Sequence, residues 1–321
     1  MKIASEGFTE LLFRDEVDAH LELSSALSAQ TKFFKEKSRL HWLGEGDRNS
    51  ASFYRYACNK KKNNNISMLL IDDLVCTDSK LISEHIVGFY KSLFNGNSEA
   101  QNLDFGIIRE FIPNLVSQDD NYSLTRVPCE EEIKLAIFSM NESSAPGPDG
   151  FGGVFYRSCW DIIHKDVSAA VQEFFITGSM PSNLNSNFMV LIPKQESSAT
   201  LDKFRPIALG NFLFKIITRI LADRLNPIAS RIISPQQFGF IRGRRIHDCI
   251  AIASEGVNCL DGLNSSRNMA IQVDIKKAFD TLDWRFLLKV LKCFGFSDLF
   301  GSWVNNILGS ARISILINGY P

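Results

Sequence analysis

The sequence lacks the features of a secreted or membrane-spanning protein. Its seven cysteines are scattered through 321 residues and include no Cys-x-x-Cys pair, so neither a disulfide framework nor a zinc site is expected. The opening residues show no positive-then-apolar secretory pattern. No apolar run approaches the roughly 18 residues that cross a bilayer. We therefore expect an intracellular protein that does not span a membrane.

Two common binding motifs are also missing. The loop "SSAPGPDG" at 143–150 is rich in Pro and Gly, but no Gly-Lys-Ser or Gly-Lys-Thr follows it, so it is not a Walker-type phosphate loop. Without that chemistry it can be a plain turn-rich connector. His247 has no second histidine at metal-ligand spacing and is expected to be a helix-end residue.

The charge of the chain is balanced in total but not along its length. Hydrophobic residues make up 45% and charged residues 22%, which is ordinary globular composition, and 321 residues are enough for about two domains. Between Thr31 and Asn65, nine Lys and Arg residues stand against three acids, whereas the whole chain has a net charge of −1. A basic segment beside an acidic remainder is a mild indication of nucleic-acid binding.

Hydrophobic spacing predicts an α+β protein. Helices are expected at 8–39, 79–94, 154–177, 212–231, 245–260, 284–294 and 298–308, with another beginning at Pro128. Strands are expected at 66–71, 187–194, 269–275 and 312–319. The basic run "NKKKNNN" at 59–65 is interpreted as a linker loop, Gly178 as a helix stop, and 95–127 as irregular. The predicted regions are 1–65 (helical, basic), 66–127 (connecting) and 128–321 (the main domain).

The last predicted element is "RISILING", residues 312–319. Isoleucines alternate along it, and Asn318-Gly319 is a strong hairpin signal. The partner strand is expected to follow Pro321, and an unpaired apolar edge strand is a feature that folded proteins avoid. We therefore expect the 321 residues to be a fragment.

Two cationic patterns could bind anions. Lys194 ends the short strand-like segment "VLIPK", and Arg205 begins a second one, "RPIAL". A lysine and an arginine from adjacent strands could bind a triphosphate together, or they could simply be surface cations. "QQFGFIRGRRIHD" gathers Gly239, Arg242, Arg244 and Arg245 with two phenylalanines. That mixture suits nucleic-acid contacts, but a solvated loop leading into a helix explains it equally well.

The stretch "IQVDIKKAFDTLDW" at 271–284 places Asp274 at the end of an apolar, strand-like run. The carboxylate could cap the following helix. It could also be a Mg²⁺ ligand that holds a hard cation against substrate phosphates.

Taken in order, these pieces resemble the reverse transcriptase domain of non-LTR (LINE-type) retrotransposons, particularly plant copies. The resemblance covers roughly 130–321 and rests on "SSAPGPDGFGGVFYRSCW", "FMVLIPK", "FRPIALGNFLFKIITRILADRL", "PQQFGFIRGRRIHDCI" and "VDIKKAFDTLDW". Upstream, "KSRLHWLGEGDRNSASFYR" at 37–55 resembles the segment that links endonuclease and polymerase domains in these elements.

The resemblance implies the fingers and part of the palm of a right-hand polymerase, a small antiparallel sheet with packed helices. Its partners would be an RNA template, a DNA primer and a deoxynucleotide triphosphate, with Mg²⁺ as cofactor and the nucleus as location. The implied roles are metal binding and catalysis for Asp274, nucleotide binding for Lys194, Arg205, Ile275 and Phe279, and nucleic-acid binding for Gly239, Arg242, Arg244 and Arg245. Phe279 would be the gate against a ribose 2′-OH.

The sequence departs from this family in one respect. The other two metal carboxylates of the family lie in a Tyr-x-Asp-Asp hairpin, preceded by an Arg-Gln-Gly-Asp loop, and neither occurs in residues 1–321. Asp72 and Asp73 in "LLIDDLV" lie far upstream and are expected to form a turn. The family therefore implies an RNA-directed DNA polymerase fragment that is inactive alone.

Three alternatives stay open at this point. The chain could be a nucleic-acid-binding remnant that uses 31–65 and the Arg242–Arg245 loop. It could be a product that hardly folds. It could also be a Mg²⁺ phosphatase built on Asp274, Asp280 and Asp283, although 274 and 280 would not share a helix face.

Overall fold

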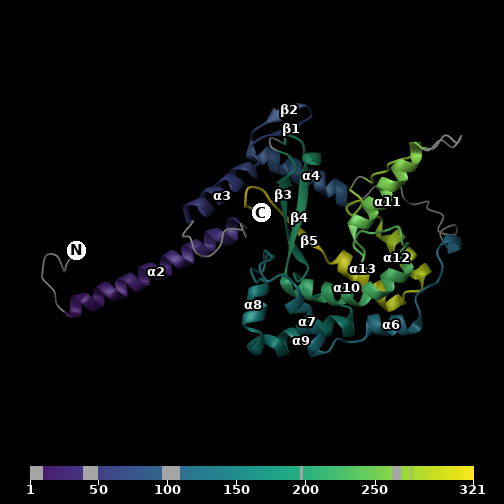
Figure 1. Ribbon diagram of the computed structural model, residues 1–321, viewed down its shortest axis with the longest axis horizontal. Coiled ribbons are helices and arrows are strands. Elements are labelled where there is room, and N and C mark those ends of the chain that lie inside the picture. Colours follow the sequence, from purple (N-terminus) through teal and green to yellow (C-terminus); the bar gives the residue numbers. More distant parts are fainter. Residues whose placement is uncertain (1–9, 39–49, 96–108, 196–197, 262–268, 276) are drawn as a thin grey trace. The chain divides into compact units, whose positions relative to one another are not determined.

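The computed structural model describes residues 10–38, 50–95, 109–195, 198–261, 269–275 and 277–321. The protein is α+β, mostly helical with small sheets, as predicted (Figure 1). It divides into two compact units, one formed by residues 1–79, 191–205 and 317–320 and the other by 80–190, 206–316 and 321. None of the described helices is both long and apolar enough to cross a bilayer.

The first unit begins with two helices that pack side by side, α2 (Glu10–Ser38) and α3 (Ser50–Asn63). A tight hairpin follows, in which β1 (Leu69–Ile71) pairs antiparallel with β2 (Leu74–Cys76). Asp72 and Asp73 form its turn with φ of 49° and 63°. Aspartate tolerates this left-handed conformation, which two-residue hairpin turns require, so the predicted turn is confirmed. The strand itself is shorter than the predicted 66–71.

The predicted linker loop at 59–65 is wrong. Helix α3 continues through the three lysines to Asn63, and only Asn64 and Asn65 lie outside it. Lysine is a good helix former, and cations in a last turn interact favourably with the negative end of the helix dipole. These two effects outweigh the breaker character of the asparagines.

Most of the second unit is a helical core. Its helices are α4 (Ser79–Asn95), α6 (Gln118–Thr125), α7 (Glu130–Ser139), α8 (Gly153–Ser158), α9 (Trp160–Thr177), α10 (Phe212–Ile232), α11 (Ile246–Asn258), α12 (Trp284–Phe294) and α13 (Asp298–Gly309). Helix α10 contacts α6, α7 and α9 (Figure 1). Its apolar residues recur at helical spacing, so Ile216 and Ile220 are fully buried beside Phe174 of α9 and Trp303 of α13 in one cluster.

Helix boundaries in this unit follow the sequence with two exceptions. The helix predicted at 154–177 is interrupted at Cys159, and Gly178 ends it in the left-handed conformation as predicted, with φ of 67°. Helix α6 lies in the stretch predicted as irregular. Ser117 and Asp120 form a capping box at its start, a local signal that could have located the helix.

The larger sheet has the order β4–β3–β5, formed by β3 (Ser186–Pro193), β4 (Phe204–Gly210) and β5 (Arg312–Leu316). The predicted small antiparallel sheet needs correction, because β5 runs parallel to β3 from Ser186↔Arg312 to Val190↔Leu316. The sequence also predicts that residues 312–319 have no partner strand before Pro321. This prediction is wrong, because β5 pairs with β3. Asn318 and Gly319, with φ of 55° and 94°, form the predicted turn.

Asn185 explains why β5 lies beside β3. Its buried side chain donates to the Ile307 carbonyl (2.7 Å) and to Ser310 Oγ (3.0 Å) at the end of α13. Its own carbonyl accepts from the Arg312 N–H at 3.0 Å. A parallel pair needs a long crossover connection, which the intervening helices supply.

Candidate functional site

The segment that carries Asp274 is not the buried strand that the sequence predicts. Residues 269–275 have irregular backbone, and all seven are exposed, including Val273 at 79% and Ile275 at 72%. No backbone partner of this segment is found among the residues that the structure describes. A strand needs the hydrogen bonds of a neighbour, so the alternating apolar pattern alone does not form one. Asp274 and Ile275 therefore lie on an exposed segment.

The three aspartates near this segment have separate surroundings. Asp283 caps α12 by accepting from the Phe286 N–H at 2.9 Å and pairs with Arg285 at 3.0 Å, and these hydrogen bonds lower its pKa. Burial, reinforced by the charge of Asp280, raises the pKa of Tyr90 in α4 to about 12. In the described part of the chain, no three His, Cys, Asp or Glu residues gather into a metal-binding group. The three-aspartate phosphatase site is therefore not formed there.

Lysine and arginine side chains share one face of the β3–β4 pair. The Lys194 N–H donates to the Lys203 carbonyl at 2.8 Å, so the two residues lie opposite each other where β3 ends and β4 begins, and Arg205 lies two residues further along the chain in β4. Cross-strand partners share a face, and alternate residues of one strand do too, so this pairing places Lys194, Lys203 and Arg205 on one face. Both are exposed, and Lys194 Nζ donates to the Asp202 carbonyl at 2.8 Å. Lys203 joins them, a cation that sequence reasoning missed because only strand pairing reveals it.

One arginine of the loop before α11, Arg244, is partly buried and hydrogen-bonded to backbone carbonyls of its own chain. Arg244 donates from Nη1 to the carbonyls of Ser234 (2.5 Å) and Gln237 (2.6 Å). Its Nη2 donates to the carbonyls of Ser230 (3.2 Å) and Ile233 (3.0 Å). The sequence predicts this residue as a nucleic-acid contact, but its hydrogen bonds are made to its own chain.

The other basic residues of this loop point outward. Arg242 and Arg245 are exposed, and neither side chain has a hydrogen bond or ion pair within the described ranges. Gly239 is only partly buried and has ordinary space around it. Phe240 is 92% exposed with φ of 65°, a conformation that is rare for a bulky residue.

Phe279 contacts this loop. Its ring packs edge-on against Phe240, with centroids 5.8 Å apart. Phe279 is itself 84% exposed and belongs to a turn in which the Asp280 N–H donates to the Lys277 carbonyl at 2.9 Å. The structure therefore brings the predicted gate next to the glycine- and arginine-rich loop.

The Pro- and Gly-rich loop at 143–150 is anchored to the N-terminus of α10. Asn211 is buried and accepts the Asp149 N–H through Oδ1 at 3.1 Å. A Cβ on Gly147 would lie 2.4 Å from the Asn211 nitrogen, so only glycine fits there. Lys215 donates to the Ala145 carbonyl at 3.3 Å, and burial lowers its pKa, partly offset by Asp149. The loop is a fixed structural connector.

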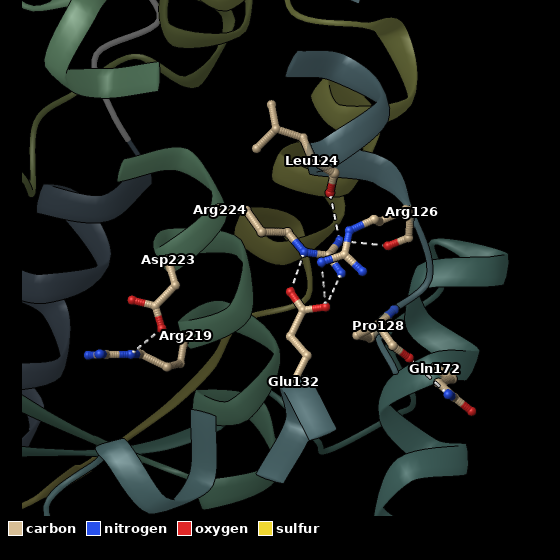
Figure 2. Close-up of polar contacts among 8 residues, drawn as sticks. All are labelled: Leu124, Arg126, Pro128, Glu132, Gln172, Arg219, Asp223 and Arg224. Atoms are coloured by element: carbon tan, nitrogen blue, oxygen red, sulfur yellow. Dashed lines mark hydrogen bonds and ion pairs between the residues drawn. The ribbon is translucent and has the colours of Figure 1, made fainter. Parts of the chain in front are cut away.

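An ion pair between α7 and α10 was not expected from the sequence (Figure 2). Arg224 of α10 binds Glu132 of α7 with two nearly parallel hydrogen bonds of 2.7 and 2.9 Å. Its Nη1 also donates to the carbonyls of Leu124 (3.0 Å) and Arg126 (2.6 Å). Only 6% of the Arg224 side chain is exposed. Burial opposes ionisation of Glu132, but Arg224 and Arg126 outweigh it and lower the pKa.

Comparisons with known proteins agree with the resemblance to reverse transcriptases that the order of motifs indicates. Residues 192–320 match the family model described as "Reverse transcriptase (RNA-dependent DNA polymerase)". The chain is 26% identical over 312 residues to the "Transposon TX1 uncharacterized 149 kDa protein" of Xenopus laevis, covering 96% of this chain and 23% of that protein. It is 25% identical over 244 residues to the Pol polyprotein from type-2 retrotransposable element R2DM of Drosophila melanogaster, covering 72% and 22%.

A further relative is the Pol polyprotein from a type-1 R2 element of Nasonia vitripennis, 26% identical over 181 residues and covering 54% of this chain and 16% of that protein. The chain thus spans about a quarter or less of the length of these curated relatives. The matched region contains Lys194, Arg205, the arginine loop and Asp274. Residues 192–320 are therefore similar to a reverse transcriptase, and the chain as a whole is similar to proteins of the TX1 and R2 elements.

Proposed function

We propose that the chain supplies the fingers and part of the palm of an RNA-directed DNA polymerase from a LINE-type element, of the kind found in plants. Residues 128–321 would hold this domain, preceded by a connecting region at 66–127 and a basic helical region at 1–65. Its partners would be an RNA template, a DNA primer and a deoxynucleotide triphosphate. The parent element would work in the nucleus.

The observation that carries this proposal is the shared face of Lys194, Lys203 and Arg205. Lysine offers a compact charge and arginine a planar fork, a combination that suits a flexible polyanion such as a triphosphate. Phe279 would act as the gate against a ribose 2′-OH, with Ile275 beside the incoming nucleotide. Gly239, Arg242 and Arg245 would lie along the nucleic-acid strand.

The residues present fit Mg²⁺ only in part. The carboxylate of Asp274 is exposed and is a suitable oxygen ligand for a hard cation. In-line phosphoryl transfer uses two metal ions about 4 Å apart, and one carboxylate cannot hold both. Residues 1–321 contain no Tyr-x-Asp-Asp sequence that would supply the others. We therefore expect the 321-residue chain to bind substrates without catalysing polymerisation.

Primer extension tests the catalytic half of the proposal. We expect no Mg²⁺-dependent incorporation by the 321-residue chain on an RNA template with a DNA primer. Incorporation that disappears in Asp274→Asn would show that the carboxylate works without the Asp-Asp hairpin, and would contradict this expectation.

Nucleotide binding tests the other half. A fluorescent deoxynucleotide triphosphate should bind about tenfold more weakly to Lys194→Gln, Lys203→Gln and Arg205→Gln, because each loses one charge-assisted hydrogen bond. Lys165→Gln on α9, which removes an exposed cation elsewhere, is the matched control. Equal affinities for all four variants would mean that the shared face does not bind the triphosphate.

A non-catalytic nucleic-acid-binding role is the second candidate. It is favoured by α3, whose charged residues are Arg55 and three lysines with no acid among them. Phosphate contacts make the logarithm of the binding constant fall linearly with the logarithm of salt concentration. Binding to single-stranded RNA that falls steeply with salt, without nucleotide binding, would support this role. Salt-insensitive binding would oppose it.

A further inference from the structure

Arg244 has no free donors at the end of its side chain. A guanidinium carries four N–H groups on its two terminal nitrogens and a fifth on Nε. Both terminal nitrogens are engaged, with two carbonyl acceptors each at 2.5–3.2 Å. A bidentate contact with a phosphate needs two parallel N–H groups. Arg244 therefore cannot make that contact without breaking several hydrogen bonds.

The acceptors explain where Arg244 acts. Ser230 lies in the last turn of α10, and Ile233 and Ser234 directly follow that helix. Helix C-termini leave carbonyl groups unpaired and carry a partial negative charge, so a cation is favourable there. Gln237, the fourth acceptor, belongs to the loop that leads to α11. Arg244 joins the helix end to the loop.

The same loop is bent by its backbone. Gly243 has φ of 87°, in the left-handed region, and the Arg244 N–H donates to the Ile241 carbonyl at 3.2 Å. Asn226 of α10 accepts the Arg242 N–H at 3.4 Å. With Arg244 directed inward, Arg242 and Arg245 on either side of it are left exposed.

We propose that Arg244 is a positioning residue that fixes residues 236–245 on the end of α10, so that Arg242 and Arg245 face a nucleic-acid backbone. The inference rests on the proposed nucleic-acid contact of this loop. It assigns Arg244 to holding the loop in place and not to contacting the nucleic acid. Lysine keeps the charge at this position, but its three donors on one nitrogen cannot match four carbonyls arranged around a planar fork.

Two measurements on Arg244→Lys test this inference. The first is hydrogen exchange of the backbone amides at 236–245, expected to become about tenfold faster because fork hydrogen bonds are lost. The second is the salt dependence of binding to an RNA–DNA duplex. Each phosphate contact contributes roughly 0.9 to the slope of log binding constant against log salt concentration. Arg242→Gln and Arg245→Gln should therefore each reduce the magnitude of this slope by about 0.9.

The conservative variant should lower that slope as far as the Arg242→Gln/Arg245→Gln double variant does, although it removes no charge. Arg219→Lys is the control, because Arg219 lies on the same helix and pairs with exposed Asp223; it should change neither measurement. Unchanged hydrogen exchange at 236–245 in Arg244→Lys would show that Arg244 does not fix this loop on the end of α10. Faster exchange with an unchanged slope would overturn the positioning role. If the wild-type chain shows no salt-dependent binding, the proposed nucleic-acid contact is wrong. Hydrogen exchange then tests separately whether Arg244 fixes residues 236–245 on the end of α10.

Discussion

The pair of Arg224 and Glu132 offers a quantitative test of what holds the second unit together. In Glu132→Gln the guanidinium stays buried and loses its carboxylate, a change that costs about 3–5 kcal/mol for a fully buried pair. The Glu132 side chain is 22% exposed, and two backbone carbonyls still accept from Arg224. We therefore expect a smaller loss of about 2–3 kcal/mol, at or just below the lower limit of that range.

Urea unfolding followed by tryptophan fluorescence would measure this loss, because Trp160 and Trp303 are both buried in the same core cluster. Thermal unfolding should show a fall of about 5–10 °C for a unit of this size. Asp223→Asn on the same helix breaks an exposed i,i+4 pair with Arg219 and should cost no more than about 0.5 kcal/mol. Equal losses in the two variants would refute the reasoning.

The pH dependence gives a second check on the same pair. The folded-state pKa of Glu132 lies below its ordinary value of 4.5, so the carboxylate contributes its full stability above that value. The contribution is lost as pH falls through the lowered folded-state pKa. The stability difference between wild type and Glu132→Gln should therefore be constant at neutral pH and shrink in acid. The double variant Arg224→Met/Glu132→Gln should recover part of the loss, because it buries no unpaired charge.

Three further predictions concern single positions. Gly147→Ala should lower the free energy of unfolding by about 1–3 kcal/mol, because its Cβ would overlap Asn211; Gly88→Ala, in an open position on α4, should raise it by about 0.5–1 kcal/mol in the same urea assay. Asp120, whose pKa is lowered to about 2 chiefly by Arg231 and also by Ser117, should contribute stability above its ordinary 3.8 that is lost as pH falls toward 2; an acid titration in which Asp120→Asn follows wild type would contradict this. Asp283→Ala should cost about 1 kcal/mol as a lost helix cap, whereas Asp274→Asn on its exposed segment should leave the unfolding curve unchanged, and an unfolded Asp274→Asn variant would show that the segment is packed.

Local patterns were sufficient for the elements that stabilise themselves through short-range signals. The helix at Phe212–Ile232 follows from its apolar spacing, and Gly178 ends α9 because glycine accepts positive φ. The turns at Asp72-Asp73 and Asn318-Gly319 follow from residue type. The reverse transcriptase resemblance depended on the order of motifs along the chain, which is also a property of the sequence.

The sequence by itself determined most of the helices, the turns and the family resemblance, because these depend on residue spacing, local capping signals and motif order. It missed α6 and the continuation of α3 through the three lysines. Tertiary structure decided what depends on partners. Residues 269–275 have strand composition but pair with no other part of the chain that the structure describes, and β5 lies parallel to β3, next to the Asn185 side chain that contacts the end of α13. Arg244 and Arg224 are indistinguishable from surface arginines in the sequence. Only the tertiary structure shows that Arg244 donates to backbone carbonyls and that Arg224 pairs with Glu132.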